Sequence, residues 1–593
     1  MNQKLALGLI ASITLIVITN LLAHLNLYWS WMSYDSWNLY SQYIEFGTPA
    51  YFFFKYYGHP MILPKLIFTG ELNYLSGTYI SVIWLGVASY VLCSALLIHA
   101  LWRDLQPATP WGVKCAFASL LAGGVFWLTR SYELALPFLI GSTLVATLMT
   151  VAAYALSRHL QHQHARHPGW PSDFWWWLMC GGCVLATFTT SAGAAVWPGI
   201  GLTLLLYRVK IQRVLLFALI GILALTGTFL MPTGNEPVPL SAVLEMLPSA
   251  GTAFQYFTIF LGGALNFSLF PQEGGNTGVP LLSGILGAAG TLTLCIYTWR
   301  LYRRQAHHTA RALPLALGWF AIFTALAATI GRAGIDMTSN PVAGFYTTWS
   351  VLLWLALLWL ALSHLGETGL QSARGRAAFA ALGMGCLLIF ASASYHGLNF
   401  MLEEHRNNQI GGLSMIVAPQ KRAADARRLM FLNPQPVFDN LPHMRARRHN
   451  LFFEAWTQQL GAPLSKHYAI LDDAGCFGVW RERSAWRRND SRIYEGWAHS
   501  PSGNFDTVLF TSAGVIIGGA KPTWIGDPTK LDPQRELPGP GRHLLGVLLG
   551  YHSGWLGVAD TTMTANTAEI EAYGVLDTHT VCQLSDPDPG GNQ

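Results

Sequence analysis

Long apolar runs, nearly free of charge, recur along the first two thirds of the chain. About 20 consecutive apolar residues are needed to cross the hydrocarbon core of a bilayer as a helix. The pattern therefore predicts about eleven transmembrane helices, at residues 5–26, 79–101, 111–128, 134–156, 174–190, 194–207, 214–231, 281–298, 313–330, 346–365 and 377–395. The first run lacks a small-residue cleavage site, so we expect it to be retained as an anchor.

The pattern changes after residue 395. Residues 403–448 are rich in charge and predict helix and linker. Short alternating segments bounded by turns follow, which is typical of a small β-sandwich or barrel. The expected strands are 468–471, 477–481, 507–511, 514–517, 546–550, 555–559, 569–575 and 581–584. We therefore predict three regions: a transmembrane domain at 1–398, a helical linker region at 399–466 and a β-rich domain at 467–593.

Composition excludes an ordinary soluble protein. Hydrophobic residues make up 52% of the 593 positions and charged residues only 11%, and the mean hydropathy is +0.33. A soluble chain of this length needs more charge on its surface. The net charge of +5 arises from loops and gives no indication of nucleic-acid binding.

Basic residues in the short loops predict the orientation. With a cytoplasmic N-terminus, the cytoplasmic loops carry fourteen Lys and Arg residues, whereas the opposite loops before residue 400 carry four: Lys55, Lys65, Arg130 and Arg332. An odd number of spans then places the β-rich domain outside the cytosol. We therefore expect a multi-pass membrane protein whose N-terminus is cytoplasmic and whose C-terminal domain is periplasmic or extracellular.

Two cysteine pairs invite different interpretations. Cys180 and Cys183 form a C-x-x-C inside an apolar run beside two glycines, which favours close helix packing over redox or metal chemistry. Cys476 and Cys582 lie in the external domain, where a disulfide is compatible with an oxidising compartment. The sequence leaves open whether that disulfide forms.

The first external loop carries the richest candidate chemistry. Asp35 lies about nine residues after the first predicted span in an aromatic surround that includes Trp37. Such a carboxylate could accept a proton from an attacking hydroxyl or hold a divalent cation such as magnesium or manganese. Tyr57, His59 and Lys65 follow, and His59 could share a proton or orient a substrate. The alternative is an interfacial aromatic belt in which Asp35 caps a helix.

Two further groups lie at external ends of predicted spans. Arg130 and Glu133 flank the turn after the third span, where they could pair with each other or where Glu133 could serve as a site carboxylate. Arg332 lies where the ninth span meets the external face. A guanidinium matches phosphate oxygens, although Arg332 could instead snorkel to the interface.

Several short motifs resemble a known family. Asp35-Ser36-Trp37, His59, Gly331-Arg332-Ala333, Tyr346 and the segment from Ser191 to Pro198 occur in the order and on the predicted side found in bacterial GT-C-type membrane glycosyltransferases. The resemblance covers residues 1–400 and implies a location in a bacterial cytoplasmic (inner) membrane. It departs at Pro60 and Phe345, where the family pattern has positive charge.

The resemblance implies an inverting sugar transfer from a polyprenyl-phosphate carrier to a hydroxyl of a glycan, lipid or protein on the external face. It implies catalytic roles for Asp35, His59 and Glu133. Arg332, with Lys65 or Arg130, would bind the donor phosphate, and Trp37, Tyr57 and Tyr346 would contact substrate. A polytopic transporter or flippase, or a non-catalytic envelope assembly protein, remains the alternative.

Overall fold

The computed structural model divides the chain into two compact units. Unit 1 comprises Met1–His24, Gly47–Ile67 and Val82–Phe400, and unit 2 comprises Leu25–Phe46, Phe68–Ser81 and Met401–Gln593. The first external loop is thus shared between them. The structure describes residues 3–28, 31–107, 109–127, 139–164, 172–233, 248–269, 278–304, 308–333, 347–368, 370, 372–418, 429, 434–471, 475–482, 491–500, 505–523, 554–560 and 570–584.

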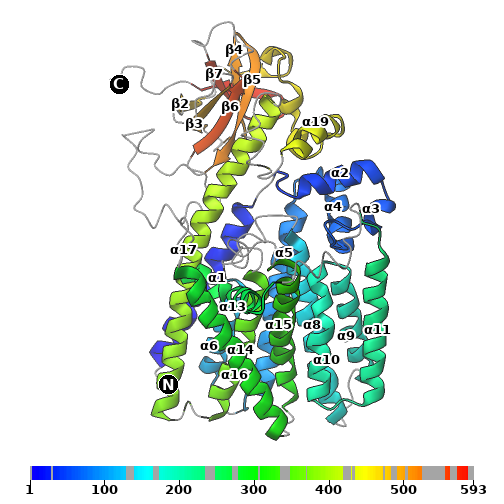
Figure 1. Cartoon of the computed structure of the whole chain (residues 1–593). Coiled ribbons are helices and arrows are strands. Elements are labelled where there is room, and N and C mark those ends of the chain that lie inside the picture. The colour runs from blue at the N-terminus through cyan, green and yellow to red at the C-terminus, as the bar shows by residue number, and fades with distance from the viewer. Residues whose placement is uncertain are drawn as a thin grey trace. The chain divides into compact units, whose positions relative to one another are not determined.

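Unit 1 is a bundle of apolar helices that run side by side (Figure 1). Its helices are α1 (Gln3–Asn26), α3 (Ala50–Phe53), α4 (Ile62–Leu75), α5 (Ile80–Asp104), α6 (Trp111–Val125), α8 (Ile140–His164), α9 (Ser172–Thr187), α10 (Val196–Leu206), α11 (Ile211–Leu230), α13 (Ala250–Leu269), α14 (Gly278–Arg304), α15 (Ala312–Arg332), α16 (Thr347–Thr368) and α17 (Ala373–Val417). Helices α1, α4, α5 and α17 extend partly into unit 2.

Eight helices in the described part of the chain are long and apolar enough to cross a membrane. They match eight of the eleven predicted spans and indicate a multi-pass membrane protein. The other three predicted spans correspond to α6 and α9, with 15 and 16 residues, and to the apolar helical stretch Ser191–Leu206. Because a helix rises about 1.5 Å per residue, these segments are short for a bilayer, and the total of eleven stays a prediction.

Small residues allow the bundle helices to approach closely. A Cβ atom added to Gly262 of α13 would collide with the backbone of Ser283 on α14, and one added to Gly287 would collide with the backbone of Thr258. Such contacts are typical of helix pairs in membranes. Helix α13 lies outside every predicted span, yet it packs against α14, α15 and α16.

The C-x-x-C segment packs as predicted. Cys180 and Cys183 are free, buried thiols on α9. A Cβ at the neighbouring Gly182 would lie 3.2 Å from the Leu148 carbonyl oxygen and 3.3 Å from Ala152 Cβ on α8. The glycine therefore serves the α8–α9 contact, which agrees with a packing role for this motif.

Unit 2 combines parts of the first external loop with the C-terminal region. Helix α2 (Ser36–Phe46) packs against α19 (Gln435–Arg447). Asn450 joins the two loop segments: its side-chain oxygen accepts from the Met32 N–H at 2.6 Å, and its side-chain amide donates to the Gly77 carbonyl at 2.5 Å. The Asn450 side chain is buried and forms hydrogen bonds with backbone groups of both segments, so it fixes their relative positions.

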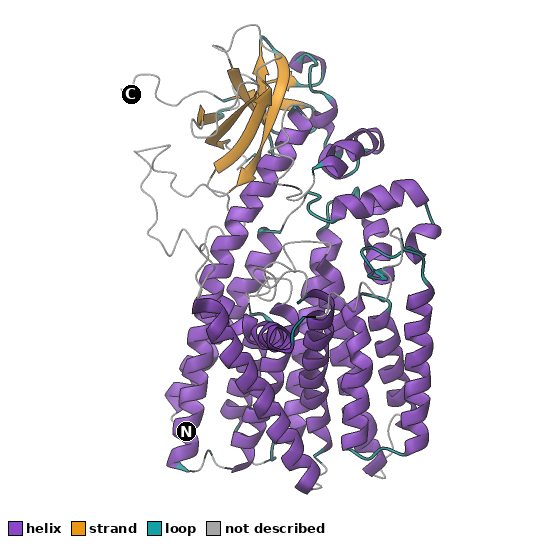
Figure 2. Cartoon of the chain, in the orientation of Figure 1, coloured by secondary structure: helices purple, strands orange, loops and turns teal. Residues whose placement is uncertain are grey.

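The C-terminal region of unit 2 forms one eight-stranded sheet (Figure 2, orange). Its strands are β1 (Ala469–Ile470), β2 (Phe477–Glu482), β3 (Ser491–His499), β4 (Val508–Ser512), β5 (Val515–Thr523), β6 (Gly554–Asp560), β7 (Ile570–Val575) and β8 (Thr580–Gln583). The order is β1-β8-β7-β4-β5-β6-β3-β2. Pairing is antiparallel except between β1 and β8. The mostly-β prediction is confirmed; β3 was missed, and the predicted strand 546–550 lies outside the described residues.

A disulfide shows that this sheet is strongly curled. Cys476 precedes the edge strand β2, Cys582 lies in β8 near the other edge, and the two are bonded with a Cα–Cα distance of 6.2 Å. Strands in a sheet lie about 4.8 Å apart, so six strand steps in a flat sheet would separate them by about 29 Å. The edges must therefore curve toward each other, as in a partly closed barrel around a core that includes Phe510, Trp555 and Cys582.

Candidate functional site

The predicted site residues are divided between the two units. His59, Tyr57, Lys65 and Arg332 belong to unit 1, whereas Asp35 and Trp37 belong to unit 2. Arg130, Glu133 and Tyr346 lie outside the described residues. The predicted convergence of Asp35 with His59 and Arg332 therefore stays a prediction, and the two groups are described separately.

A tight turn presents His59 in unit 1. The backbone N–H of Tyr56 donates to the His59 carbonyl at 2.9 Å, and the His59 N–H donates back to the Tyr56 carbonyl at 2.8 Å. Tyr57 and Gly58 occupy the turn with positive φ values of 44° and 80°, a conformation that glycine adopts without a steric cost. Tyr57 is 67% exposed at the tip, so its ring is accessible to a ligand.

His59 pairs with a residue far away in the sequence. Its Nδ1 atom lies 2.6 Å from the Ser191 hydroxyl oxygen. Ser191 begins the short 3-10 helix η3 (Ser191–Ala195), four residues after the end of α9 at Thr187. The Ile62 N–H also donates to the Phe188 carbonyl at 2.9 Å. The histidine turn is thus anchored to the end of α9 by two contacts.

Arg332 completes this group of unit 1. It is the last residue of α15 and is exposed to solvent. Burial lowers the pKa of His59 to about 4, and the positive charge of Arg332 is the second cause. The imidazole is consequently neutral at pH 7, so one ring nitrogen donates and the other accepts. We refer to His59, Ser191 and Arg332 as the histidine–arginine site.

Lys65 has a different environment. Its side chain is fully buried, and Nζ donates to the Tyr51 carbonyl at 2.8 Å and to the Phe54 carbonyl at 2.6 Å. It also lies 4.5 Å from the centre of the Tyr51 ring. Burial lowers its pKa to about 8. These contacts stabilise the end of α3, and a donor phosphate would have to compete with them for the ammonium group.

Asp35 and Trp37 lie at the start of α2 in unit 2. The Asp35 carbonyl accepts from the Leu39 N–H at 3.0 Å, so Asp35 immediately precedes the first turn of the helix, and its side chain is partly exposed. Trp37 is fully buried, and its indole N–H donates to the Met32 carbonyl at 3.0 Å. Contact between Trp37 and a substrate would require the surrounding side chains to move.

The divalent cation expected at Asp35 has no further ligands defined in the structure. Among the described residues, no group of three or more His, Cys, Asp or Glu side chains is placed to hold a metal ion. Glu133 lies outside the described part of the chain. A metal at Asp35 therefore stays a prediction.

The histidine–arginine site has the chemistry of an anion site with a proton-sharing partner. The guanidinium presents a fork of N–H donors that suits phosphate oxygens, and a neutral imidazole positions a hydroxyl without adding charge. Sequence reasoning identified His59 and Arg332 but not the bond between His59 and Ser191. Ser191 opens one of the motif segments noted in the sequence, and that was the only signal for it.

The chain matches no protein-family model, no curated protein and no solved structure.

Proposed function

We propose that this chain is a membrane glycosyltransferase that moves a sugar from a polyprenyl-phosphate carrier to a hydroxyl acceptor on the external face. The observation that carries the proposal is the grouping of exposed Arg332 with neutral His59 and Ser191 in unit 1. The apolar bundle suits a lipid-linked donor, because the lipid tail can remain among the helices while its phosphate stays at the interface. The GT-C-like motifs in the sequence agree with this reaction.

The proposed reaction is a single displacement. The acceptor oxygen attacks the anomeric carbon of the sugar, and the bond from that carbon to the phosphate oxygen breaks. The electron pair leaves with the polyprenyl phosphate, whose charge Arg332 stabilises. The acceptor proton passes to a general base, the role that the GT-C-like motif suggests for Asp35, and the anomeric configuration inverts. His59, held by Ser191, orients the sugar or the phosphate by a hydrogen bond.

A turnover assay tests the proposal. The purified chain in lipid nanodiscs is incubated with a panel of radiolabelled polyprenyl-phosphate sugars, and the release of polyprenyl phosphate is measured. We expect release with at least one donor. Failure of every donor to react with folded protein would contradict the proposal, and movement of intact donor between leaflets without release would support a flippase instead.

The role of Asp35 is tested in the same assay with a matched pair of variants. Asp35→Asn removes the proton acceptor while keeping the size of the side chain, and we expect it to abolish transfer. Asp439→Asn changes an exposed aspartate on α19 of the same unit and should leave transfer unchanged. Full activity of Asp35→Asn would remove Asp35 from the mechanism.

A further inference from the structure

A cavity of about 940 Å³ lies inside unit 1, away from the histidine–arginine site. Its walls come mainly from α14, α16 and α17. On α14 the lining extends from Leu286 to Arg300 and Leu301. At about 1.5 Å per residue, the stretch from Leu286 to Arg300 is about 21 Å long. The wall is fixed at Trp354, whose indole N–H donates to the Leu261 carbonyl at 3.0 Å.

The charged and imidazole side chains of the lining gather at one end of this cavity. The body is lined by apolar side chains such as Leu355, Leu358 and Ile389, whereas the polar end carries Arg300, His308, Arg311, His364 and Glu367. The lining is therefore amphipathic along its length. A molecule that fills it needs an apolar tail and a polar head at a fixed end.

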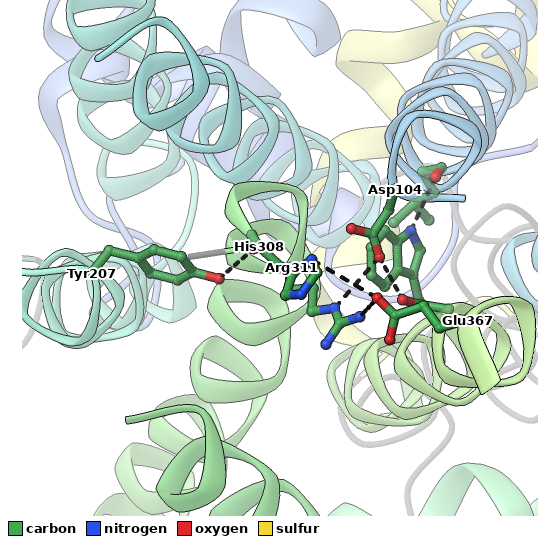
Figure 3. A network of polar contacts seen from close by, with 8 residues as sticks. Asp104, Tyr207, His308, Arg311 and Glu367 are labelled. Atoms are coloured by element: carbon green, nitrogen blue, oxygen red, sulfur yellow. Dashed lines mark hydrogen bonds and ion pairs between the residues drawn. The ribbon is translucent and has the colours of Figure 1, made fainter. Parts of the chain in front are cut away.

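The cations at the polar end differ in their partners. Arg311 lies between two carboxylates (Figure 3): its Nε is 3.5 Å from an Asp104 oxygen, and its terminal nitrogen contacts Glu367. Arg300 is exposed, and within the described part of the chain it forms no hydrogen bond or ion pair. Because Arg311 is already paired with carboxylates, Arg300 is the cation at this end that a ligand would meet. The exposed imidazoles of His308 and His364 and the Glu367 carboxylate also line this end.

The dimensions favour a phospholipid over a polyprenyl carrier. One leaflet contributes about 15 Å of a hydrocarbon core of about 30 Å, so a cavity about 21 Å long accommodates the acyl chains and glycerol region of one lipid. A polyprenyl chain of many isoprene units would leave most of its length outside. Basic pockets between transmembrane helices are known binding sites for anionic lipid head groups.

We infer that this cavity binds an anionic phospholipid, with its phosphate on Arg300 and its acyl chains between α14, α16 and α17. This site is separate from the histidine–arginine site. Arg311 precedes the first residue of α15 and Arg332 is its last, so the polar end of the cavity and Arg332 lie about 30 Å apart along that helix. The lipid site can thus exist whether or not the chain transfers sugars.

Native mass spectrometry and lipid titration test this site on the full chain. In mild detergent, we expect one tightly bound phosphatidylglycerol per chain and no comparable binding of diacylglycerol, which lacks the phosphate. Arg300→Ala should weaken phosphatidylglycerol binding at least tenfold, because a charge-assisted contact is lost. Arg303→Ala, an exposed cation on the same helix that does not line the cavity, should stay within twofold of the parent.

A second pair of variants tests the cavity itself. Thr293→Trp places an indole at a lining position of α14, whereas Leu292→Trp adds the same bulk at a neighbouring exposed position outside the lining. We expect only Thr293→Trp to abolish binding, with the unfolding temperatures of both variants close to the parent's. Equal binding of phosphatidylglycerol and diacylglycerol, unchanged binding by Arg300→Ala, or displacement by lower concentrations of polyprenyl phosphate would each overturn the inference.

Discussion

Two arginines mark the ends of α15, and they differ in almost every respect. Arg311, just before the helix, has only 11% of its side chain exposed and contacts Asp104 and Glu367 (Figure 3). Arg332, the last residue, is exposed and acts on His59 through its charge. The comparison teaches that residue type and position on a helix do not define a role. Arg311 is enclosed by two carboxylates, whereas Arg332 is exposed at the end of the helix, where a ligand can approach it.

The largest expected effect concerns stability at Arg311. Arg311→Met leaves the carboxylates of Asp104 and Glu367, whose side chains are only 5% and 25% exposed, without their counter-charge. Removing one partner of a buried ion pair costs about 3–5 kcal/mol. We expect a matching loss in the free energy of unfolding, measured by denaturant titration in detergent. The triple variant Arg311→Met, Asp104→Asn, Glu367→Gln should recover most of it; no recovery would show that packing rather than charge is responsible.

A change at Arg332, at the other end of α15, should affect activity and not stability. Arg332→Ala removes the cation proposed to stabilise the leaving phosphate, a contribution of about 2.7–4 kcal/mol, or about 100- to 1,000-fold in kcat. The unfolding temperature should remain unchanged, because the side chain is exposed. Radiolabelled donor turnover measures the effect. An Arg332→Ala variant that is unstable but active would reverse the comparison between the two arginines.

A smaller effect is expected at Ser191. Ser191→Ala deletes the hydroxyl that pairs with His59, and one hydrogen bond contributes about 1 kcal/mol, so transfer should fall about fivefold. Ser191→Thr keeps the hydroxyl and should restore most of the activity. If both variants lose activity equally, then the space around η3, and not the hydrogen bond, is what matters.

The smallest effect is a change in proton binding by His59. Because the pKa of His59 is about 4 in the folded chain and 6.5 ordinarily, the unfolded chain binds more protons between these values. Stability is therefore lost as pH falls from 6.5 toward 4. Arg332→Gln removes one cause of the lowered pKa, so NMR titration of labelled histidine should give a higher value in this variant. An unchanged value would mean that burial alone sets the pKa.

Much of the fold could be predicted because hydrophobicity is a local signal. Most of the predicted strands and the eight long apolar helices follow directly from the pattern of apolar residues. Strand β3 was missed because it carries charges at Arg492 and Glu495. Glu495 is nevertheless buried, and its charge is met by Arg481 at 2.7 Å and Arg406 at 3.4 Å. Such compensation comes from distant residues, so the local pattern cannot reveal it.

The candidate site was less predictable, because the partners of its residues lie far away in the sequence. His59 was selected as an ionisable group of the first external loop and Arg332 as one at the end of a predicted span, and both belong to unit 1. The partner of His59 lies 132 residues away, beyond any local pattern. Lys65 resembled a phosphate ligand in the sequence, yet its ammonium donates to two backbone carbonyls. Only the folded chain shows which polar groups are already satisfied.

The disulfide between Cys476 and Cys582 has a consequence for the behaviour of the β-rich region in different compartments. An exposed strand edge presents unpaired backbone groups that can template pairing with another chain and lead to aggregation. The disulfide ties the residue before edge strand β2 to β8, the neighbour of edge strand β1, and we expect this closeness of the two edges to restrict the approach of another strand. In reducing surroundings that protection would be lost. The same crosslink that shapes the sheet therefore makes its solubility dependent on an oxidising environment.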